Sequence, residues 1–152
     1  MATFGAAITN GYNGPAQSAP DTRIIKMDVF EDTSPSLMRR VTDLGAYIDT
    51  NQVLDVELKV FDLSSSTPKT ATNTLPIGVE ECLYAALQTD NAWEFDALGY
   101  NFQHKVWQQL IPSGGRVYRL EYTIHVQSTD VTIPTREIVL VWELHTVSRY
   151  GS

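Results

Sequence analysis

Three histidines and a single cysteine are the side chains of this sequence best suited to metal binding or nucleophilic chemistry. The histidines are His104, His125 and His145, and the cysteine is Cys82. A zinc site needs several ligands within bonding distance of one another. His125 and His145 fall several rungs apart on a predicted hairpin of the last two strands, and at about 3.4 Å per residue they do not meet. We therefore predict no metal site and no cofactor, with both of these histidines on the solvent-facing side of the hairpin.

The other signatures of catalysis are weak in this sequence. Cys82 lacks the flanking residues of a nucleophile and, with no second cysteine, it forms no intrachain disulfide, so we expect a small buried side chain. No Gly-x-Ser-x-Gly elbow and no phosphate-binding glycine loop before a helix occur. Carboxylates are plentiful, but nothing in their spacing places two of them in an apolar cleft, as glycoside hydrolysis requires. We predict no catalytic residue and a protein that is not an enzyme.

Three tryptophans are the remaining candidates for a binding role. Trp142 alternates with apolar residues, which predicts a place in the core. Trp93 and Trp107 fall near predicted strand ends, where exposure is expected. An exposed indole can stack on a sugar ring, and it can equally form part of a protein–protein interface. Residue type alone does not distinguish these two roles.

Composition narrows the choice of partner. Eleven basic and eighteen acidic residues give a net charge of −7 over 152 residues. An acidic protein gains nothing from the counterion release that drives nucleic-acid binding, and anionic membranes repel it. The first residues contain no basic side chain, which argues against a secretory signal, and no apolar run approaches the roughly 20 residues that span a bilayer. We expect a protein or glycan partner, with neither nucleic acid nor membrane involved.

The elements that position these residues are mainly strands. In residues 53–63, Leu54, Val56, Leu58 and Val60 alternate with charged residues, which is typical of a strand with one wet face. Residues 77–87 predict one short helix, with a strand from 82 to 87 as the alternative, and residues 64–74 predict a polar loop. The predicted strands are 24–30, 37–48 with a bulge at Gly45, 53–63, 93–96, 98–107, 116–127 and 136–147.

The last two strands predict a hairpin, and their charges favour one register. Both apolar sets must face the same side, which leaves two alignments. One places Glu121 opposite Glu143, and like charges directly opposite are unfavourable. The other pairs Arg119 with Glu143 and His125 with Glu137, and this is the register that we predict.

Residues 1–21 form a separate segment, rich in Gly, Ala, Asn and Pro and without sustained periodicity. One interpretation is a disordered tail. The other is an extended N-terminal arm that becomes ordered on a neighbouring subunit, anchored by Phe4, Ile8 and Tyr12. Residues 22–152 are predicted to form a single domain.

Two short motifs carry a resemblance to known proteins. The run Gly114-Gly-Arg-Val-Tyr-Arg-Leu-Glu-Tyr122 resembles the corner that enters a late strand of immunoglobulin-like domains. In that family a tyrosine hydrogen-bonds back to the corner loop, and Tyr118 matches it, with Gly115 in the turn. The family's disulfide is absent, which excludes the antibody type and leaves the broader sandwich group. The resemblance implies an all-β, antiparallel immunoglobulin-like sandwich of about seven strands with at most one short helix.

The run Asp96-Ala-Leu-Gly-Tyr-Asn-Phe102, followed by this corner, is similar to small β proteins encoded by phages and some bacteria. The similarity covers roughly the last third of the chain and rests on short motifs. It implies a non-enzymatic virion protein assembled in the host cytoplasm, either a capsid decoration (cement) protein or a tail or baseplate subunit. Its partners would be copies of itself and other virion proteins. The alternative is a carbohydrate- or receptor-binding module.

Overall fold

A computed structural model describes residues 23–127, 132 and 135–149 of the chain. The predicted arm, with Phe4, Ile8 and Tyr12, lies outside these residues. Among them, no helix is long and apolar enough to cross a membrane.

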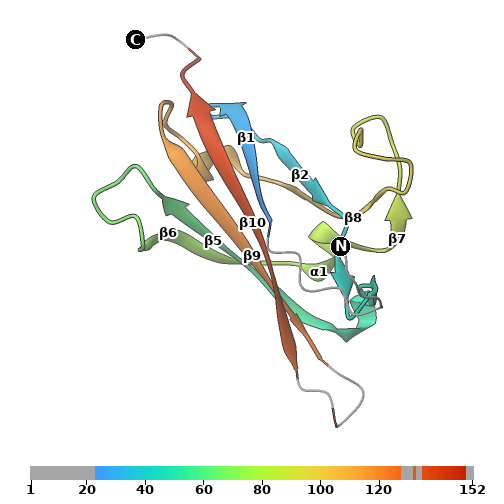
Figure 1. Cartoon of the computed structure of the whole chain (residues 1–152). Helices are drawn as coiled ribbons and strands as arrows, with labels where there is room; N and C mark the ends of the chain where they lie inside the picture. The colour runs from blue at the N-terminus through green and yellow to red at the C-terminus, as the bar shows by residue number, and fades with distance from the viewer. Residues whose placement is uncertain (1–22, 128–131, 133–134, 150–152) are drawn as a thin grey trace, which may run out of the picture.

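The described part of the chain is mostly β, with ten strands in three sheets (Figure 1). The larger sheet has the order β1-β10-β9-β5-β6, and all of its neighbours are antiparallel except β1 and β10, which are parallel. A second sheet has the order β2-β8-β7, and β3 pairs only with β4. The strands are β1 (Ile24–Phe30), β2 (Ser36–Arg39), β3 (Thr42–Asp43), β4 (Ala46–Tyr47), β5 (Val53–Asp62), β6 (Ala71–Ile77), β7 (Leu83–Gln88), β8 (Tyr100–Lys105), β9 (Val117–Val126) and β10 (Arg136–Val147). The helical segments are α1 (Val79–Cys82) and two 3₁₀ turns, η1 (Thr50–Gln52) and η2 (Gln108–Leu110).

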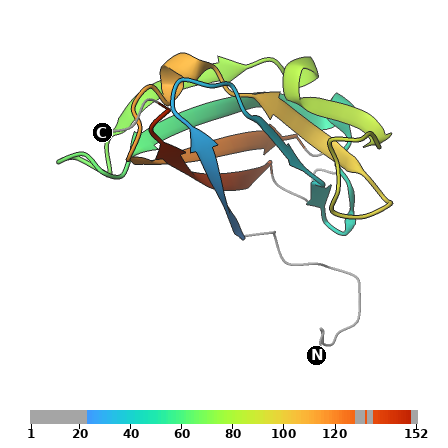
Figure 2. The ribbon, with the colours of Figure 1, turned by 90° about the horizontal axis from the view of Figure 1, so that it is seen from above.

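Aromatic rings join the two main sheets into one core, and the view from above shows the sheets as two layers (Figure 2). Phe102 of β8 stacks on Trp142 of β10, with 5.5 Å between ring centroids. Its other neighbour is Tyr122 of β9, which it meets edge-on at 5.0 Å. Alternate residues of β9 and β10 point inward, as a two-layer structure requires. The predicted core position of Trp142 is confirmed.

The predicted register of the last hairpin is also confirmed. Glu143 lies opposite Arg119, and Glu137 lies opposite His125. On the adjacent strand β5, Asp55 also faces His125, so the imidazole lies between two carboxylates at 2.5 Å (Asp55) and 2.9 Å (Glu137). These hydrogen bonds, first that of Asp55 and then that of Glu137, raise the pKa of His125. His145 occupies the same partly exposed face, as predicted.

The predicted strand 37–48 is wrong beyond its first residues. Strand β2 ends at Arg39, and the chain then forms the small hairpin β3–β4. Gly45 belongs to the turn of that hairpin rather than to a bulge, because both Leu44 and Gly45 have left-handed backbone angles. A bulge that the sequence did not predict lies at Leu54 in β5, where the strand slips by one residue against β9. Leu54 is therefore 53% exposed and does not share the buried face of Val56 and Leu58.

Three other predicted elements differ from the structure. The loop predicted over 64–74 ends early, because edge strand β6 begins at Ala71. Thr and Asn residues hide the apolar–polar alternation of β6 in the sequence. Pro76 suits an edge strand, where its missing N–H breaks no ladder hydrogen bond. The helix predicted over 77–87 is reduced to α1, and the alternative of a strand is confirmed by β7. Residues 93–96 form a folded loop and not a strand.

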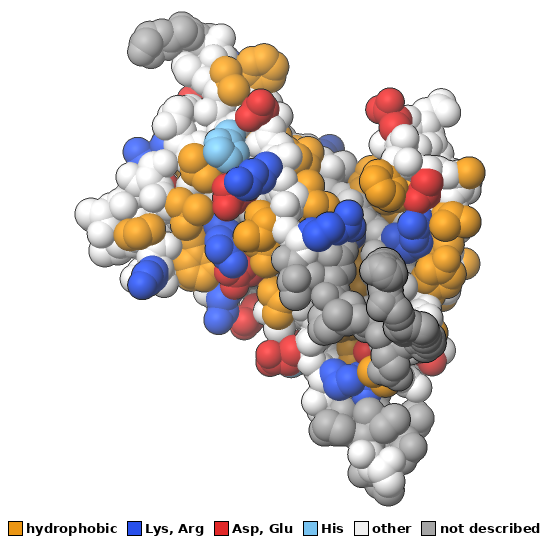
Figure 3. Space-filling model, viewed as in Figure 1, with side chains coloured by type: hydrophobic (Ala, Val, Ile, Leu, Met, Phe, Trp, Pro, Cys, Tyr) orange, Lys and Arg blue, Asp and Glu red, His pale blue; other side chains and the backbone are white. Residues whose placement is uncertain are grey.

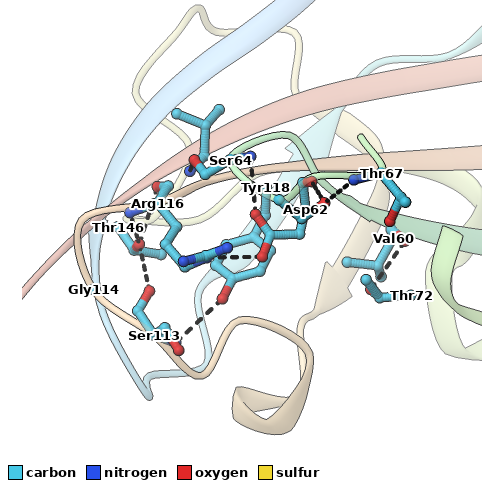
Figure 4. A network of polar contacts seen from close by, with 12 residues as sticks. Val60, Asp62, Ser64, Thr67, Thr72, Ser113, Gly114, Arg116, Tyr118 and Thr146 are labelled. Atoms are coloured by element: carbon cyan, nitrogen blue, oxygen red, sulfur yellow. Dashed lines mark hydrogen bonds and ion pairs between the residues drawn. The ribbon is translucent and has the colours of Figure 1, made fainter. Parts of the chain in front are cut away.

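The corner before β9 is built as its sequence predicts (Figure 4). The Tyr118 hydroxyl accepts a hydrogen bond from the Ser113 N–H at 3.3 Å. The Thr146 hydroxyl donates to the Ser113 carbonyl at 2.6 Å and accepts from the Arg116 N–H at 3.1 Å. Gly115 occupies the left-handed region, with φ of 69°. The corner thus ties the start of β9 to the end of β10.

Candidate functional site

A hollow of about 320 Å³ lies between the edge strands of the two main sheets and the segment 89–99, which joins β7 to β8 and projects from the smaller sheet. We call it the arginine hollow. Figure 3 shows it as a depression between the body of the larger sheet and the projecting segment. Strands β1 and β2 supply Ile25 and Met38, and the projecting segment supplies Trp93 and Phe95. The basic lining residues are Arg23, Arg39 and Arg40.

Asp96 organises the projecting segment. Its carboxylate accepts hydrogen bonds from the Trp93 indole N–H at 3.1 Å and from the backbone N–H groups of Leu98 and Gly99 at 2.9 and 3.2 Å. It also forms an ion pair with Arg40 at 2.9 Å. Burial raises the pKa of Asp96, but the hydrogen bonds from Trp93, Arg40 and the backbone outweigh burial and lower the pKa to about 2. The segment is therefore folded around one ionised carboxylate.

Asp90 anchors the other end of the same segment. It accepts a hydrogen bond from the Tyr100 hydroxyl at 2.6 Å and another from the Ala92 N–H at 2.9 Å. The bond from Tyr100 is the main reason why the pKa of Asp90 is lowered, and the same bond raises the pKa of Tyr100 to about 12. Trp93 packs against Phe95 and Tyr100, with centroid separations of 5.8 and 5.7 Å. These contacts hold the aromatic wall of the hollow in place.

Three arginines contribute to the lining of the hollow. Arg39 is only 2% exposed; its Nη2 donates to the Arg23 carbonyl at 3.0 Å, and its guanidinium lies 5.6 Å from the Trp142 ring centroid. Arg40 donates to the Gly99 carbonyl at 3.0 Å in addition to its ion pair with Asp96. Guanidinium groups beside apolar walls favour an anionic group carried on an apolar or aromatic body.

The two tryptophans singled out from the sequence do not meet. Trp93 lines the hollow but is half-buried, because Phe95 and Tyr100 pack against it. Trp107 is 53% exposed, as predicted, but it follows the far end of β8. The arginines and Phe95 were missed by sequence reasoning. The pair Arg39-Arg40 at the end of a short strand was the one available signal.

A second polar group lies in the core, where it has a structural role. The His104 ring nitrogen Nδ1 and the Tyr122 hydroxyl are 2.6 Å apart, and both side chains are buried. Burial lowers the pKa of His104 and raises that of Tyr122, so both stay neutral. Cys82 is fully buried, as predicted, and burial together with the nearby Glu81 raises its pKa to about 12. A protonated, buried thiol is a packing group and not a nucleophile.

Comparison with known proteins gives no relative from which a role can be transferred. No family model, no curated protein and no solved structure matches this chain. Among residues 23–127, 132 and 135–149, no group of three or more His, Cys, Asp or Glu side chains is placed to hold a metal ion.

The role of Asp96 can be measured through the indole N–H of Trp93. Because the pKa of Asp96 is depressed from 3.8 to about 2, ionised Asp96 stabilises the segment above pH 3.8, and this contribution is lost as pH falls towards 2. We expect the Trp93 indole N–H signal in ¹H–¹⁵N NMR spectra to titrate with a midpoint near 2. In Asp96→Asn this titration should disappear. The Trp107 indole is an internal control that should not respond, and a Trp93 midpoint at the ordinary value of 3.8 would contradict the assignment.

Proposed function

We propose that the chain is a non-enzymatic structural subunit of a bacteriophage virion, either a capsid decoration protein or a tail or baseplate component. It would be assembled in the host cytoplasm with copies of itself and other virion proteins. The observation that carries this proposal is the placing of large exposed apolar side chains on several separate parts of the described surface. A subunit inside a symmetric assembly contacts neighbours on more than one face.

Six of these exposed side chains occur in three pairs. Phe30 and Val147 are direct neighbours across β1 and β10, and they are 58% and 46% exposed. Leu44 and Tyr47 share the β3–β4 hairpin, and Phe95 and Leu98 share the projecting segment. Isolated exposed apolar residues need no explanation, whereas contiguous apolar patches mark contact surfaces.

Strand order supports an immunoglobulin-like assignment within this proposal. In that fold one sheet contains neighbouring strands C, F and G, extended by C′ in the variable type, and the other contains B, E and D. The order β6-β5-β9-β10 matches C′-C-F-G, and β2-β8-β7 matches B-E-D. The hydrogen bond from the Ser113 N–H to the Tyr118 hydroxyl is similar to the tyrosine corner of that family and supports the assignment.

A carbohydrate- or receptor-binding module is the second candidate, and one observation favours it. The Trp107 indole is 53% exposed and free to stack on a sugar ring. Trp93 gives less support, since its ring packs against Phe95 and Tyr100.

Particle association tests the proposal directly. Phage particles are purified from cells that express the gene cluster containing this chain and are then analysed by quantitative mass spectrometry and immunogold microscopy. We expect a fixed copy number per particle, and we expect Phe30→Ser/Val147→Ser to lower it. Lys69→Gln, an exposed change in the β5–β6 loop, is the control. Particles without the chain, together with a monomeric chain in solution, would overturn the proposal, and glycan-array binding lost in Trp107→Ala would favour the second candidate.

A further inference from the structure

We propose that edge strand β1 is a self-association surface, which pairs antiparallel with β1 of a second copy and joins the two larger sheets into one. This inference rests on the proposed function, which calls for contacts between copies of the chain. It names one such contact, the register of its strands and the side chains that select the partner.

Strand β1 is the regular edge of the larger sheet, and among the described residues it has a strand neighbour on one side only (Figure 2). It pairs with β10 along its whole length without a register shift. At the opposite edge, β6 contains Pro76, and its pairing with β5 shifts between Val60 and Phe61. Prolines and bulges hinder the addition of a further strand to an edge, and β1 has neither. β1 is therefore the edge to which another strand can add.

The backbone of β1 presents hydrogen-bonding groups to this open edge. The Glu31 N–H, directly after the strand, donates to the Val147 carbonyl of β10 at 2.9 Å. Backbone groups point to alternate sides along a strand, so those of Lys26 and Asp28 point away from β10. Two residues directly opposite each other in an antiparallel pair can exchange both of their backbone hydrogen bonds. A second copy that places its Asp28 opposite Lys26 forms these bonds at both symmetry-related positions.

The side chains of β1 select one register for this pairing. When the strands are centred on Met27, Lys26 lies opposite Asp28 of the second copy, and the two-fold symmetry repeats the pair. Lys26 and Asp28 are exposed, and neither forms an ion pair with a described residue of its own chain. Centring the strands on Lys26 or on Asp28 instead would place like charges directly opposite, which is unfavourable. The register centred on Met27 also pairs the whole strand.

Strand β10 extends the charge complementarity beyond β1. On the outer face of the larger sheet, Glu143 lies beside Lys26, and His145 lies beside Asp28. Across the junction one row of side chains then contains Glu143 and Lys26 of one copy, followed by Asp28 and His145 of the other. Each of the two lysines thus has a carboxylate on either side, one from its own chain and one from the second copy.

An apolar row runs parallel to this charged one. Ile24 and Phe30, at opposite ends of β1, are 41% and 58% exposed in the single copy. In the register centred on Met27 each lies opposite the other across the junction. On β10, Val141 lies beside Ile24 and Val147 lies beside Phe30, so the row is apolar from one copy to the next. Pairing therefore removes two exposed apolar side chains of each copy from water.

Charge reversal with complementation tests the pairing in the full-length chain. Sedimentation equilibrium over a concentration series should show a monomer–dimer equilibrium. Its dissociation constant should rise roughly tenfold or more in Lys26→Asp and in Asp28→Lys, because each change places like charges opposite each other at both positions. An equimolar mixture of the two variants should form a heterodimer about as tight as the wild-type dimer, since opposite charges then face each other again.

Hydrogen exchange of the wild-type chain locates the contact without any substitution. The amides of Lys26 and Asp28 should gain protection as the protein concentration rises through the dissociation constant. Lys69→Asp is the matched control, because it reverses a charge in the β5–β6 loop and should leave the dissociation constant unchanged. Thermal melts verify that every variant is folded.

The proposal is overturned if the chain is monomeric at every concentration, if both charge-reversal variants still dimerise as the wild type does, or if their mixture does not associate. Equal protection of the two amides at every concentration also overturns it, because the edge would then be covered within one chain. Particle association is measured separately. A chain that is monomeric in solution but present in particles would overturn this inference and leave the proposed function standing.

Discussion

Replacing Trp142 with alanine is expected to destabilise the protein by about 3–5 kcal/mol, the usual loss for a large aromatic side chain deleted from a core. Trp142 is 1% exposed and contacts the rings of Phe102 and Tyr122. The substitution also removes the ring contact of the Arg39 guanidinium. In the variant this guanidinium stays buried beside a cavity. Denaturant unfolding followed by far-UV circular dichroism measures the loss without depending on tryptophan fluorescence.

Trp107→Ala is the matched control for this measurement. Because half of the Trp107 side chain is exposed, its truncation should change the free energy of unfolding by no more than about 0.5 kcal/mol. Equal losses in the two variants would mean that Trp142 is not the centre of the core.

The second large effect is expected at Gly114, where an alanine should cost about 1–3 kcal/mol by overpacking. An added Cβ would lie 2.7 Å from the Ser148 Cα, 2.9 Å from the Ser148 nitrogen and 3.0 Å from a Glu31 carboxylate oxygen. The backbone of Ser148 cannot give way as a flexible side chain would. The Gly114 N–H donates to Glu31 at 2.8 Å, and we expect this bond to be lost as the chain moves apart.

A substitution at the neighbouring Gly115 tests the effect of backbone conformation without the effect of steric crowding. Gly115 has φ of 69°, but a Cβ there meets nothing within 4 Å. Asparagine tolerates this conformation, so Gly115→Asn should stay within about 1 kcal/mol of the wild type. An unchanged unfolding midpoint in Gly114→Ala would show that the corner is loose enough to accept a methyl group.

The sequence predicted those features of the fold that depend on strong local patterns. The register of β9 and β10 followed from the position of charges, because only one alignment avoided placing Glu121 opposite Glu143. Strand β6 was missed because Thr and Asn hide its alternation, and the bulge at Leu54 was missed because an unbroken period-two pattern runs through it.

The arginine hollow was not predictable in the same way. Its lining comes from three segments, around Ile25, Met38 and Trp93, that are distant in sequence. Only the packing of the two sheets and the hydrogen bonds of Asp96 bring them together. The exposure of Trp107 could be inferred from its place near a strand end, whereas the partial burial of Trp93 depends on how the segment folds onto Tyr100.

The parallel pairing of β1 with β10 bears on how the protein is made. Strand β1, the first described strand, can pair with β10 only after β10, the last described strand, has been synthesised. β10 then pairs with β1 on one side and with β9 on the other. Contacts between such distant parts of a chain form slowly, and until they form the unpaired edges stay open to aggregation. A polypeptide released early from the ribosome would lack β10, so only copies translated through β10 can complete the larger sheet.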